Sequence, residues 1–375
     1  MPGTAKPSTL NQMLQSAIDD FFSNQPKGEI ARGVSVGLVD ASGGGTPVIV
    51  TDWRGEANSS NGTPVAQDTV FEIGSVSKTF TTTMLAGYLL DGSFSLTDTA
   101  QSCYDRFGIQ VSLPTYPAPE GPQAMTLRGL GDYTSGLADK RPPGLTTPYG
   151  FSFDDMHSYL SGLDQLADPP GTKYRYVNTD FGILAELVLN QGGFADYGAA
   201  LADLISGAGL EMPDTGAITS NTPTIPNLAQ GHKIGGEPEP NYALPTWPAF
   251  LGAGGVYATI GDMLQWLQFN MGLLDSPWND RLAVTQKVYF RDGHDTGNGL
   301  GWFFGTQSDG ALRIDKNGGT GGFHAYMGFL PGQKIGVVAL CNSAEPASAA
   351  PNRGKGPPLD NMCKDLLVQV NALGS

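Results

Sequence analysis

The segment FEIGSVSKTF at residues 71–80 decides how the rest of the chain is interpreted. It places Ser75 and Lys78 three positions apart at the start of a predicted helix, residues 75–92, whose apolar surface ends at a glycine. Because residues three apart on a helix share a face, we expect the Lys78 amine within hydrogen-bonding range of the Ser75 hydroxyl. An unpaired N–H in the first turn and the helix dipole would favour negative charge beside the serine. The pair is a candidate nucleophile and base, although Ser-x-x-Lys alone also recurs by chance.

Size and composition limit the class of protein. The chain has 375 residues, of which 40% are hydrophobic, with 52 glycines and 27 prolines, as is typical of a soluble globular protein rich in turns. This length favours two lobes. The formal net charge is −15 and the sequence has no basic cluster, so nucleic acid is not an expected partner. No apolar run of about 18 residues could span a membrane. The start, MPGTAKPSTL, lacks signal-peptide features, which predicts a cytosolic chain or a mature form whose leader was removed.

Strand patterns occur at the two ends of the chain. Residues 33–40 alternate apolar and polar side chains, and residues 46–57 follow after a glycine-rich turn, which predicts a β-hairpin. Late in the chain, Asp-Gly at 309–310 and Pro-Gly at 331–332 join further strand-like segments. Two early strands and three or four late strands predict one antiparallel sheet.

Helical patterns flank these strands and fill the middle of the chain. Amphipathic segments at residues 9–24 and 359–373 predict terminal helices that cover the sheet. Between the strand regions, residues 95–245 alternate helical segments with proline-rich loops. The predicted fold class is α/β (α+β): a sheet domain made of residues 1–94 and 246–375, with a mostly helical lobe inserted. The cleft between the two lobes is the natural place for a site.

A second motif is expected to assist the lysine. An ammonium group cannot abstract a proton, so Lys78 must be neutral part of the time or share its proton with another base. The segment DPPGTKYRYVNTDFGIL offers Tyr176 and Asn178 in a Tyr-x-Asn arrangement on a loop that leads into a helix. The alternative is a capping asparagine beside a packed tyrosine.

A third motif lies at a predicted strand end within RIDKNGGTGGFHAYMGFL, residues 313–330. Lys316 is followed there by an asparagine and two glycines, and glycines on a strand edge let a ligand approach the backbone closely. The N–H of Gly319 could join that of Ser75 in an oxyanion hole. The alternative is a glycine-rich hairpin without a catalytic role. His324 follows closely, and either faces the cleft or packs in the fold.

Other catalytic patterns are weaker. GVSVG at residues 33–37 matches the Gly-x-Ser-x-Gly elbow of hydrolases, but it lies inside an alternating strand pattern, so Ser35 is predicted to be structural. The segment NGGTGGF lacks the Gly-Lys-Ser/Thr ending of a phosphate loop. Four histidines are scattered without metal-ligand spacing: His157, His232, His294 and His324. No cofactor and no metal ion are expected.

The three cysteines carry a structural prediction. Cys103, Cys341 and Cys363 are widely separated and have no Cys-x-x-Cys partner, so neither a zinc site nor a dense disulfide framework is expected. They are predicted to be buried thiols. A disulfide between Cys103 and Cys363 remains an open alternative in an oxidising compartment.

Together, the three motifs resemble those of the penicillin-recognising serine hydrolases, specifically the class C β-lactamase-like branch. That branch includes class C β-lactamases, DD-peptidases, D-aminopeptidases and family VIII-type carboxylesterases. The motifs occur in the family's order, with SVSK at 75, YVN at 176 and KNG at 316. Further segments look similar to the family's, among them FEIGSVSKTFTTTMLAGYLLDGSFSLTD, LRGLGDYTSGL, PPGTKYRYVNTDFGIL and GGTGGFHAYMGFLP. The resemblance implies a β-lactamase/transpeptidase-like fold.

The resemblance also implies roles for individual residues. Ser75 would be the nucleophile, and Lys78 and Tyr176 would act as general base and proton shuttle. The N–H groups of Ser75 and Gly319 would form the oxyanion hole. The residues expected to bind substrate are Asn178, Lys316, Asn317, Gly318, Gly319 and His324.

One departure from the family pattern concerns substrate recognition. The family's β-lactamases usually carry Lys-Thr-Gly at the third motif, where the threonine hydroxyl helps to hold the substrate carboxylate, whereas this chain has Asn317. An amide can still donate a hydrogen bond, but its reach and geometry differ. Asn342 is kept further along, yet Ala344 stands where a second polar anchor is usual. Recognition of a substrate carboxylate is expected to be weaker.

The resulting prediction is a serine hydrolase that forms an acyl-enzyme on Ser75. Its expected substrates, small molecules or peptides, are β-lactams or peptidoglycan-like D-amino-acid amides. Two alternatives remain open: a carboxylesterase that acts on small acyl esters, and a penicillin-binding protein that is acylated without turnover. Because family members that act on cell-wall peptides work outside the cytoplasm, a periplasmic or secreted location is expected.

Overall fold

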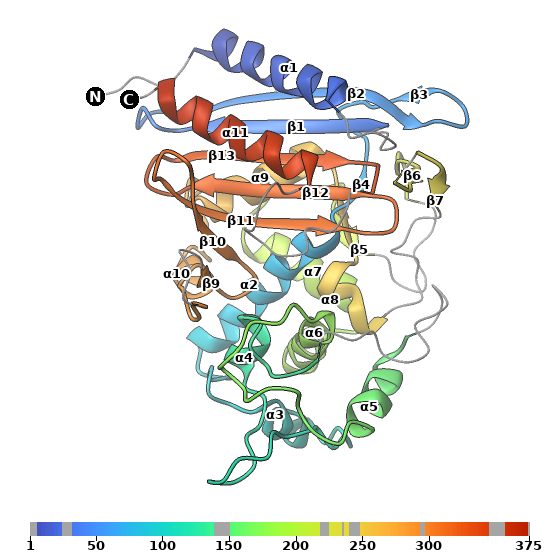
Figure 1. Cartoon of the computed structure of the whole chain (residues 1–375), viewed down its shortest axis with the longest axis vertical. Coiled ribbons are helices and arrows are strands. Elements are labelled where there is room, and N and C mark those ends of the chain that lie inside the picture. Colours follow the sequence, from blue (N-terminus) through green and yellow to red (C-terminus); the bar gives the residue numbers. More distant parts are fainter. Residues whose placement is uncertain are drawn as a thin grey trace.

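The predicted antiparallel sheet is the centre of the computed structural model (Figure 1). Within the described residues it has eight strands in the order β3-β2-β1-β13-β12-β11-β10-β9, and neighbouring strands are antiparallel throughout. The described residues are 6–24, 32–138, 151–217, 225–234, 236–239, 248–292, 297–344 and 357–373. The strands of this sheet are β1 (Gly33–Asp40), β2 (Val48–Asn58), β3 (Thr63–Pro64), β9 (Gly297–Asn298), β10 (Phe303–Thr306), β11 (Leu312–Gly319), β12 (His324–Leu330) and β13 (Ile335–Cys341). Early and late strands therefore share one sheet, as predicted.

The late hairpins form where the turn residues predict them. Strands β10 and β11 pair across a turn that contains Gly310, whose φ of +85° is a left-handed conformation that glycine adopts without steric cost. Strands β12 and β13 pair in register from His324 opposite Cys341 to Leu330 opposite Ile335. All residues of β1, β12 and β13 are buried, because helices cover both faces of the sheet.

Helices pack on both faces of the sheet. On one face, α1 contacts β2 and α11 contacts β12 and β13, and these two helices also touch each other. On the other face, α9 packs against β1 and β13, and the turn η1 packs against β11 (Figure 1). The helical elements are α1 (Pro7–Ser23), η1 (Gly74–Val76), α2 (Ser77–Leu90), α3 (Ala100–Phe107), α4 (Leu127–Gly131), α5 (Phe153–Ser161), α6 (Asn178–Gly192), α7 (Tyr197–Gly207), η2 (Pro248–Phe250), α8 (Leu251–Gly254), α9 (Ile260–Asn270), α10 (Asp280–Thr285) and α11 (Pro358–Leu373). Both terminal helices are therefore present where the sequence predicts them.

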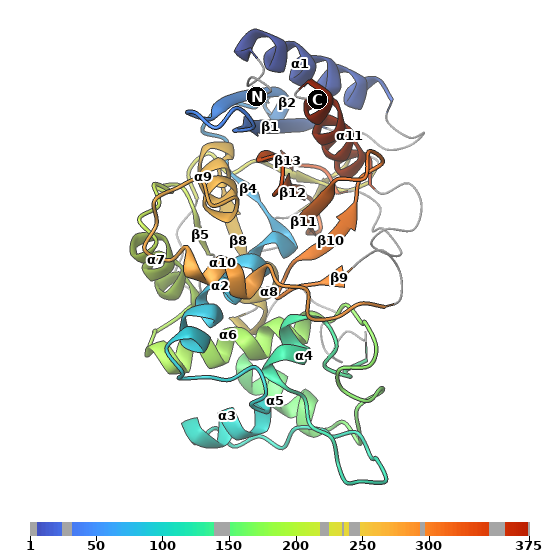
Figure 2. The same cartoon turned by 90° about the vertical axis from the view of Figure 1, so that its left-hand side faces the viewer.

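The middle of the chain forms the other end of the molecule. Figure 2 shows α3, α4, α5 and α6 gathered at the end opposite to α1 and α11. Two smaller sheets complete the described strands: a three-stranded sheet in the order β4-β8-β5 and the pair β6-β7. Their strands are β4 (Phe71–Glu72), β5 (Gly216–Ala217), β6 (Gly231–His232), β7 (Pro238–Glu239) and β8 (Val256–Ala258). The predicted division into residues 1–94 with 246–375 and residues 95–245 stays a prediction, and its second boundary lies outside the described residues.

The start of the central helix differs from the sequence expectation. Ser75 does not open the α-helix but lies in the 3-10 turn η1, and α2 begins two residues later at Ser77. The Ser77 hydroxyl donates to the Gly74 carbonyl oxygen at 2.6 Å and accepts from the Val256 amide at 3.1 Å. These two bonds tie the tight turn to strand β8. The turn thereby holds Ser75 at the junction of β4 and α2.

The cysteines are buried and form no disulfide. Cys103 lies in α3, Cys363 in α11 and Cys341 at the end of β13. Cys103 and Cys363 belong to separate hydrophobic clusters. The interpretation as buried thiols is confirmed, and the alternative disulfide between Cys103 and Cys363 is wrong because the fold places them at opposite ends of the molecule.

Among the described residues, the helices are too short or too polar to cross a bilayer.

We expect intact-mass spectrometry to find three alkylated thiols when the protein is denatured without reductant. The physical reason is that none of the three cysteines forms a disulfide, so unfolding makes every thiol available to iodoacetamide. In the native protein, labelling should be slow because each thiol is buried. Alkylation of a single thiol in the denatured, unreduced protein would contradict this arrangement.

Candidate active site

The nucleophile candidate is the one solvent-reachable residue in its segment. Within residues 71–86, all of which are described, every residue is buried except Ser75, which is partly exposed. Burial of its neighbours follows from their position, since η1 packs against β11 and α2 packs against α6 and α8. The fold therefore presents the Ser75 hydroxyl to solvent from an otherwise buried turn.

Lys78 lies beneath this serine and makes three short polar contacts. Its Nζ is 2.9 Å from Ser75 Oγ, 2.8 Å from Asn178 Oδ1 and 2.6 Å from the Ala253 carbonyl oxygen. The predicted proximity of Ser75 and Lys78 is thus confirmed. A neutral amine has two N–H bonds and one lone pair. The two carbonyl-type oxygens can only accept, so when the amine is neutral its lone pair is left to take the Ser75 proton.

The environment of Lys78 favours the neutral amine. The side chain is fully buried in the first turn of α2. Burial lowers the pKa of the Lys78 ammonium well below its ordinary value, the positive charge of Lys316 lowers it further, and the buried carboxyl of Asp180 acts in the opposite direction. A buried lysine of this kind can act as a base near neutral pH.

Tyr176 and Lys316 form the opposite wall. The Lys316 Nζ donates to the Tyr176 hydroxyl at 3.2 Å. It also lies 4.1 Å from the ring centre of Phe303 and 4.6 Å from that of Tyr176, so aromatic faces surround the cation. Burial lowers the pKa of Lys316 well below its ordinary value, while Asp315 raises it. The structure therefore brings the second and third motifs into contact.

Tyr133 supports this wall and was missed by sequence reasoning. Its ring stacks on Tyr176 at a centroid distance of 5.2 Å and an interplanar angle of 18°, and its hydroxyl donates to the Gly301 carbonyl at 3.1 Å. Its φ is +65°, an uncommon conformation for a bulky residue, and such strained residues cluster at functional sites. No local pattern in LRGLGDYTSGL signals this conformation. Asp180 was missed as well, because a carboxyl in a helical first turn usually indicates a solvated cap.

Two glycines let β11 approach the nucleophile turn. A Cβ on Gly318 would lie 2.0 Å from the Ile73 carbonyl oxygen and 2.7 Å from the Ser75 amide nitrogen. A Cβ on Gly74, whose φ is +51°, would lie 2.6 Å from the Gly319 nitrogen. The amide nitrogens of Ser75 and Gly319 thus lie at one contact between η1 and β11. This geometry suits a pair of N–H donors to an oxyanion.

Asn317 and His324 do not join the residues around Ser75. Side chains alternate along a strand, so Asn317 points away from Lys316, to the face of the sheet covered by α11. The Asn317 amide donates to Asp360 Oδ2 at 2.9 Å, and His324 Nε2 lies 2.8 Å from Asp360 Oδ1. Their expected substrate contacts stay predictions, but both side chains are directed to α11.

Asn342 is used to hold the backbone. Its Nδ2 donates to three carbonyl oxygens, those of Glu56 at 2.9 Å, Gln230 at 3.0 Å and Ala57 at 3.2 Å. The side chain is fully buried. These bonds join the ends of β2 and β13 to the segment before β6, and they give Asn342 a structural role.

The remaining candidates have structural surroundings. Ser35 is fully buried in the middle of β1, opposite Trp53 and Leu340, so the prediction that it is structural is confirmed. His157 lies 2.9 Å from Glu186, His232 lies 2.8 Å from the Ser59 hydroxyl, and His294 is outside the described residues. The described part of the chain contains no group of three or more metal-ligating side chains.

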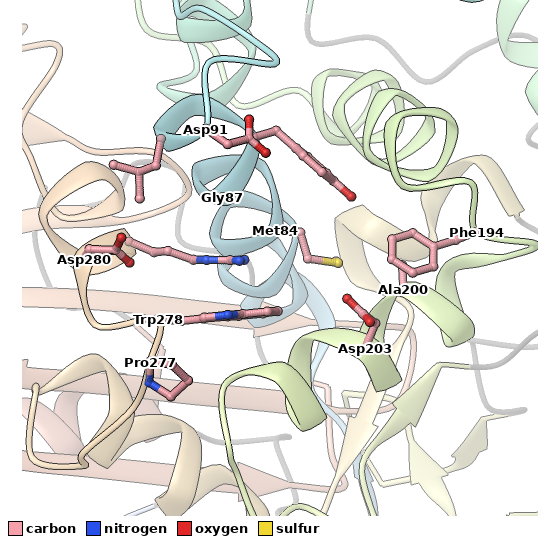
Figure 3. A pocket seen from close by; sticks show the side chains of 12 residues that line it. Met84, Gly87, Asp91, Phe194, Ala200, Asp203, Pro277, Trp278 and Asp280 are labelled. Carbon is pink, nitrogen blue, oxygen red and sulfur yellow. The ribbon is translucent and has the colours of Figure 1, made fainter.

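A separate pocket of about 490 Å³ lies beside the second half of α2 (Figure 3). Met84 and Tyr88 of α2, Asp203 of α7, and Trp278 and Arg281 near α10 line it. The Arg281 guanidinium stacks on the Trp278 ring at 3.3 Å and donates to the Thr83 carbonyl at 3.2 Å. Neither Ser75 nor Lys78 lines this pocket, so it is distinct from the site around the serine.

Comparisons with known sequences give one family and several relatives. The family model described as Beta-lactamase matches residues 18–355. The D-alanyl-D-alanine-carboxypeptidase/endopeptidase AmpH of Escherichia coli (strain K12) is 28% identical over 352 residues, which cover 90% of this chain and 86% of that protein. A Beta-lactamase of the same strain is 27% identical over 382 residues, which cover 92% of each chain.

Solved structures are similar over nearly the whole chain. The D-alanine carboxypeptidase AmpC from Burkholderia cenocepacia superposes with a TM-score of 0.73 at 25% identity, covering 97% of this chain and 100% of that one. A class C beta-lactamase superposes with a TM-score of 0.75 at 22% identity, covering 96% of each chain. The predicted fold class is confirmed by these superpositions.

We expect Gly318→Ala to destabilise the protein by on the order of 3 kcal/mol, because the new methyl group would overlap the Ile73 carbonyl and push β11 away from η1. Urea unfolding of the purified variant measures this change. The matched control is Gly332→Ala in the turn between β12 and β13, where an added Cβ meets nothing within 4 Å. Equal stability of the two variants would contradict the close contact of β11 with η1.

Proposed function

The chain belongs to the Beta-lactamase family, and from that membership we propose that it is a serine hydrolase that forms an acyl-enzyme on Ser75. Hydrolase chemistry is common to the relatives named as carboxypeptidase and beta-lactamase. The observation that carries the serine mechanism is the set of three contacts at Lys78 Nζ, which leaves the lone pair of a neutral amine for the Ser75 proton.

Acylation begins with proton transfer from Ser75 Oγ to the neutral amine of Lys78, 2.9 Å away. The oxygen then attacks the carbonyl carbon of the substrate, and a C–O bond forms while the carbonyl oxygen becomes an oxyanion. The amide N–H groups of Ser75 and Gly319 are proposed to stabilise that oxyanion. Their nitrogens lie at the contact between η1 and β11, beside the nucleophile.

Tyr176 is proposed to carry the proton to the leaving group. When the tetrahedral intermediate collapses, the bond between the carbonyl carbon and the leaving nitrogen or oxygen breaks, and that atom must be protonated. The Tyr176 hydroxyl oxygen accepts a hydrogen bond from the Lys316 ammonium group. A positive charge beside this oxygen stabilises the phenolate form of Tyr176. In deacylation, the Tyr176 phenolate takes a proton from water, and the water oxygen attacks the acyl carbon. The bond from that carbon to Ser75 Oγ then breaks, and Oγ takes back the proton held by Lys78.

The proposed substrates are β-lactams or peptidoglycan-like D-amino-acid amides. The relatives named as D-alanine carboxypeptidase and beta-lactamase support this substrate class. Asn178 is proposed to bind the substrate amide through its Nδ2, because its Oδ1 is occupied by Lys78. From a cell-wall substrate we infer a periplasmic or secreted place of action.

We expect a labelled penicillin to add one acyl group to the wild-type protein and none to Ser75→Ala, as measured by intact-mass spectrometry. Attack by Ser75 opens the β-lactam ring without loss of atoms, so the adduct has the mass of the whole penicillin. Release of the adduct together with turnover of a chromogenic cephalosporin would support the hydrolase. Cys341→Ser serves as the matched control, because this buried thiol lies outside the site.

The same assay separates the alternatives. A stable adduct without turnover would instead identify a penicillin-binding protein. Turnover of nitrophenyl esters alone would identify a carboxylesterase. Full activity of Ser75→Ala in every assay would contradict the mechanism.

We expect the rate of acylation to rise with pH through an apparent pKa well below 10.5, since the reaction needs Lys78 neutral and burial lowers the pKa of Lys78 from that value. Lys316→Met should move this rise to higher pH. Loss of the Lys316 charge removes one cause of the lowered Lys78 pKa, so a higher pH is needed to deprotonate the amine. Acylation rates at a series of pH values measure the shift.

The control for this shift is Lys287→Gln, which removes an exposed lysine charge away from the site. It should leave the pH profile where the wild type has it. A profile of Lys316→Met that moves to lower pH would refute the assignment of Lys78 as the base.

A further inference from the structure

We propose that Asp360 is a positioning residue that holds the end of β11, with the Gly319 N–H, in place behind the oxyanion site. This inference rests on the proposed function of Ser75 and goes beyond it, because Asp360 lies on the opposite face of the sheet from the serine. It acts on the reaction through the strand that it holds, while its charge also raises the pKa of Lys316 from a distance.

Asp360 binds two strands with one carboxylate. The residue lies in the first turn of α11 and is almost fully buried, with 3% of its surface exposed. Oδ2 accepts from the Asn317 amide at 2.9 Å, and Oδ1 lies 2.8 Å from His324 Nε2. Asn317 belongs to β11 and His324 to β12. Each carboxylate oxygen therefore has a donor on a different strand.

These two contacts enclose Gly319. In the ladder, Gly319 lies directly opposite His324, and Asn317 lies opposite Tyr326. Asn317 is two residues before Gly319, so it points to the same face of the sheet. The Asp360 carboxylate thus binds His324, which is paired with Gly319, and Asn317, which lies two positions before Gly319. On the other face, Gly74 packs against the nitrogen of Gly319.

Further polar groups make this network rigid. Asp315, on the same face of β11, pairs with Arg313 at 2.6 Å and accepts from the Tyr326 hydroxyl at 2.8 Å. The Lys364 ammonium, one turn along α11, lies 4.0 Å from Asp360. A buried carboxylate is tolerated when donors and an opposite charge surround it, and a fully satisfied network fixes one arrangement of its members.

The proposed role of Asp360 concerns the position of the Gly319 N–H relative to the oxyanion. Donors of an oxyanion hole act only when they are held within a few tenths of an ångström of the position of the oxyanion. If the end of β11 is released, the substrate can still bind, but the Gly319 N–H no longer meets the developing charge. A loss of this kind lowers kcat and leaves KM nearly unchanged.

The test is Asp360→Leu. Leucine is close to aspartate in shape but has no polar side-chain atom, so it accepts from neither Asn317 nor His324. We expect kcat and the rate of Ser75 acylation by penicillin to fall about 10-fold or more, with KM within about threefold of wild type. Asp365→Asn is the control, because it changes an exposed carboxylate of the same helix and leaves both hydrogen bonds of Asp360 in place.

A rescue variant separates positioning from general damage to the fold. Asp360→Asn keeps both hydrogen bonds without the charge, because its oxygen accepts from His324 and its NH₂ group donates to the Asn317 oxygen once that amide turns over. A kcat of Asp360→Asn close to that of the wild type would support the proposal. Unchanged kcat in Asp360→Leu would overturn it, as would an Asp360→Asn variant that regains stability in urea but no activity.

The proposed function fails in a different way. If Ser75→Ala keeps its activity, the serine mechanism is wrong and the positioning role falls with it. If Ser75→Ala is inactive while Asp360→Leu matches the wild type, only the role of Asp360 is refuted.

Discussion

The arrangement of this site depends on the complete burial of Lys78. An exposed lysine would be protonated and would serve only as a counter-charge, whereas a buried one loses the hydration that stabilises its ammonium form. The fold adds a second buried lysine, Lys316, at the same site, and its positive charge lowers the pKa of Lys78 further. The carboxyl of Asp180 partly offsets this. The site can therefore hold a neutral amine beside the Ser75 hydroxyl.

Local sequence patterns were sufficient to predict the sheet and the first pair of site residues. The spacing of Ser75 and Lys78 reflects helical geometry, which is the same in every fold, and the Asp-Gly turn before β11 depends only on backbone preference. The alternation of side chains along a strand is a further local pattern. It places Asn317 on the opposite face from Lys316, so its direction toward α11 was predictable without a structure.

Other features depend on contacts between distant parts of the chain. The Ala253 carbonyl that binds Lys78 has no sequence signature, because every residue has a carbonyl group. The left-handed backbone of Tyr133 is maintained by packing against Tyr176 and by a hydrogen bond to Gly301, and neither partner is near it in sequence. Propensities describe the neighbours of a residue along the chain, so they cannot indicate such strain.

The order of the strands in the sheet has a consequence for biosynthesis. Strand β1 lies between β2 and β13, so the second edge of β1 is covered only after the much later β13 has been synthesised. The nucleophile turn is likewise made long before β11, against which it packs. Contacts between such distant segments form slowly, and unpaired strand edges are prone to aggregation while they wait. Ser75 therefore acquires its full surroundings only after β11 has been synthesised.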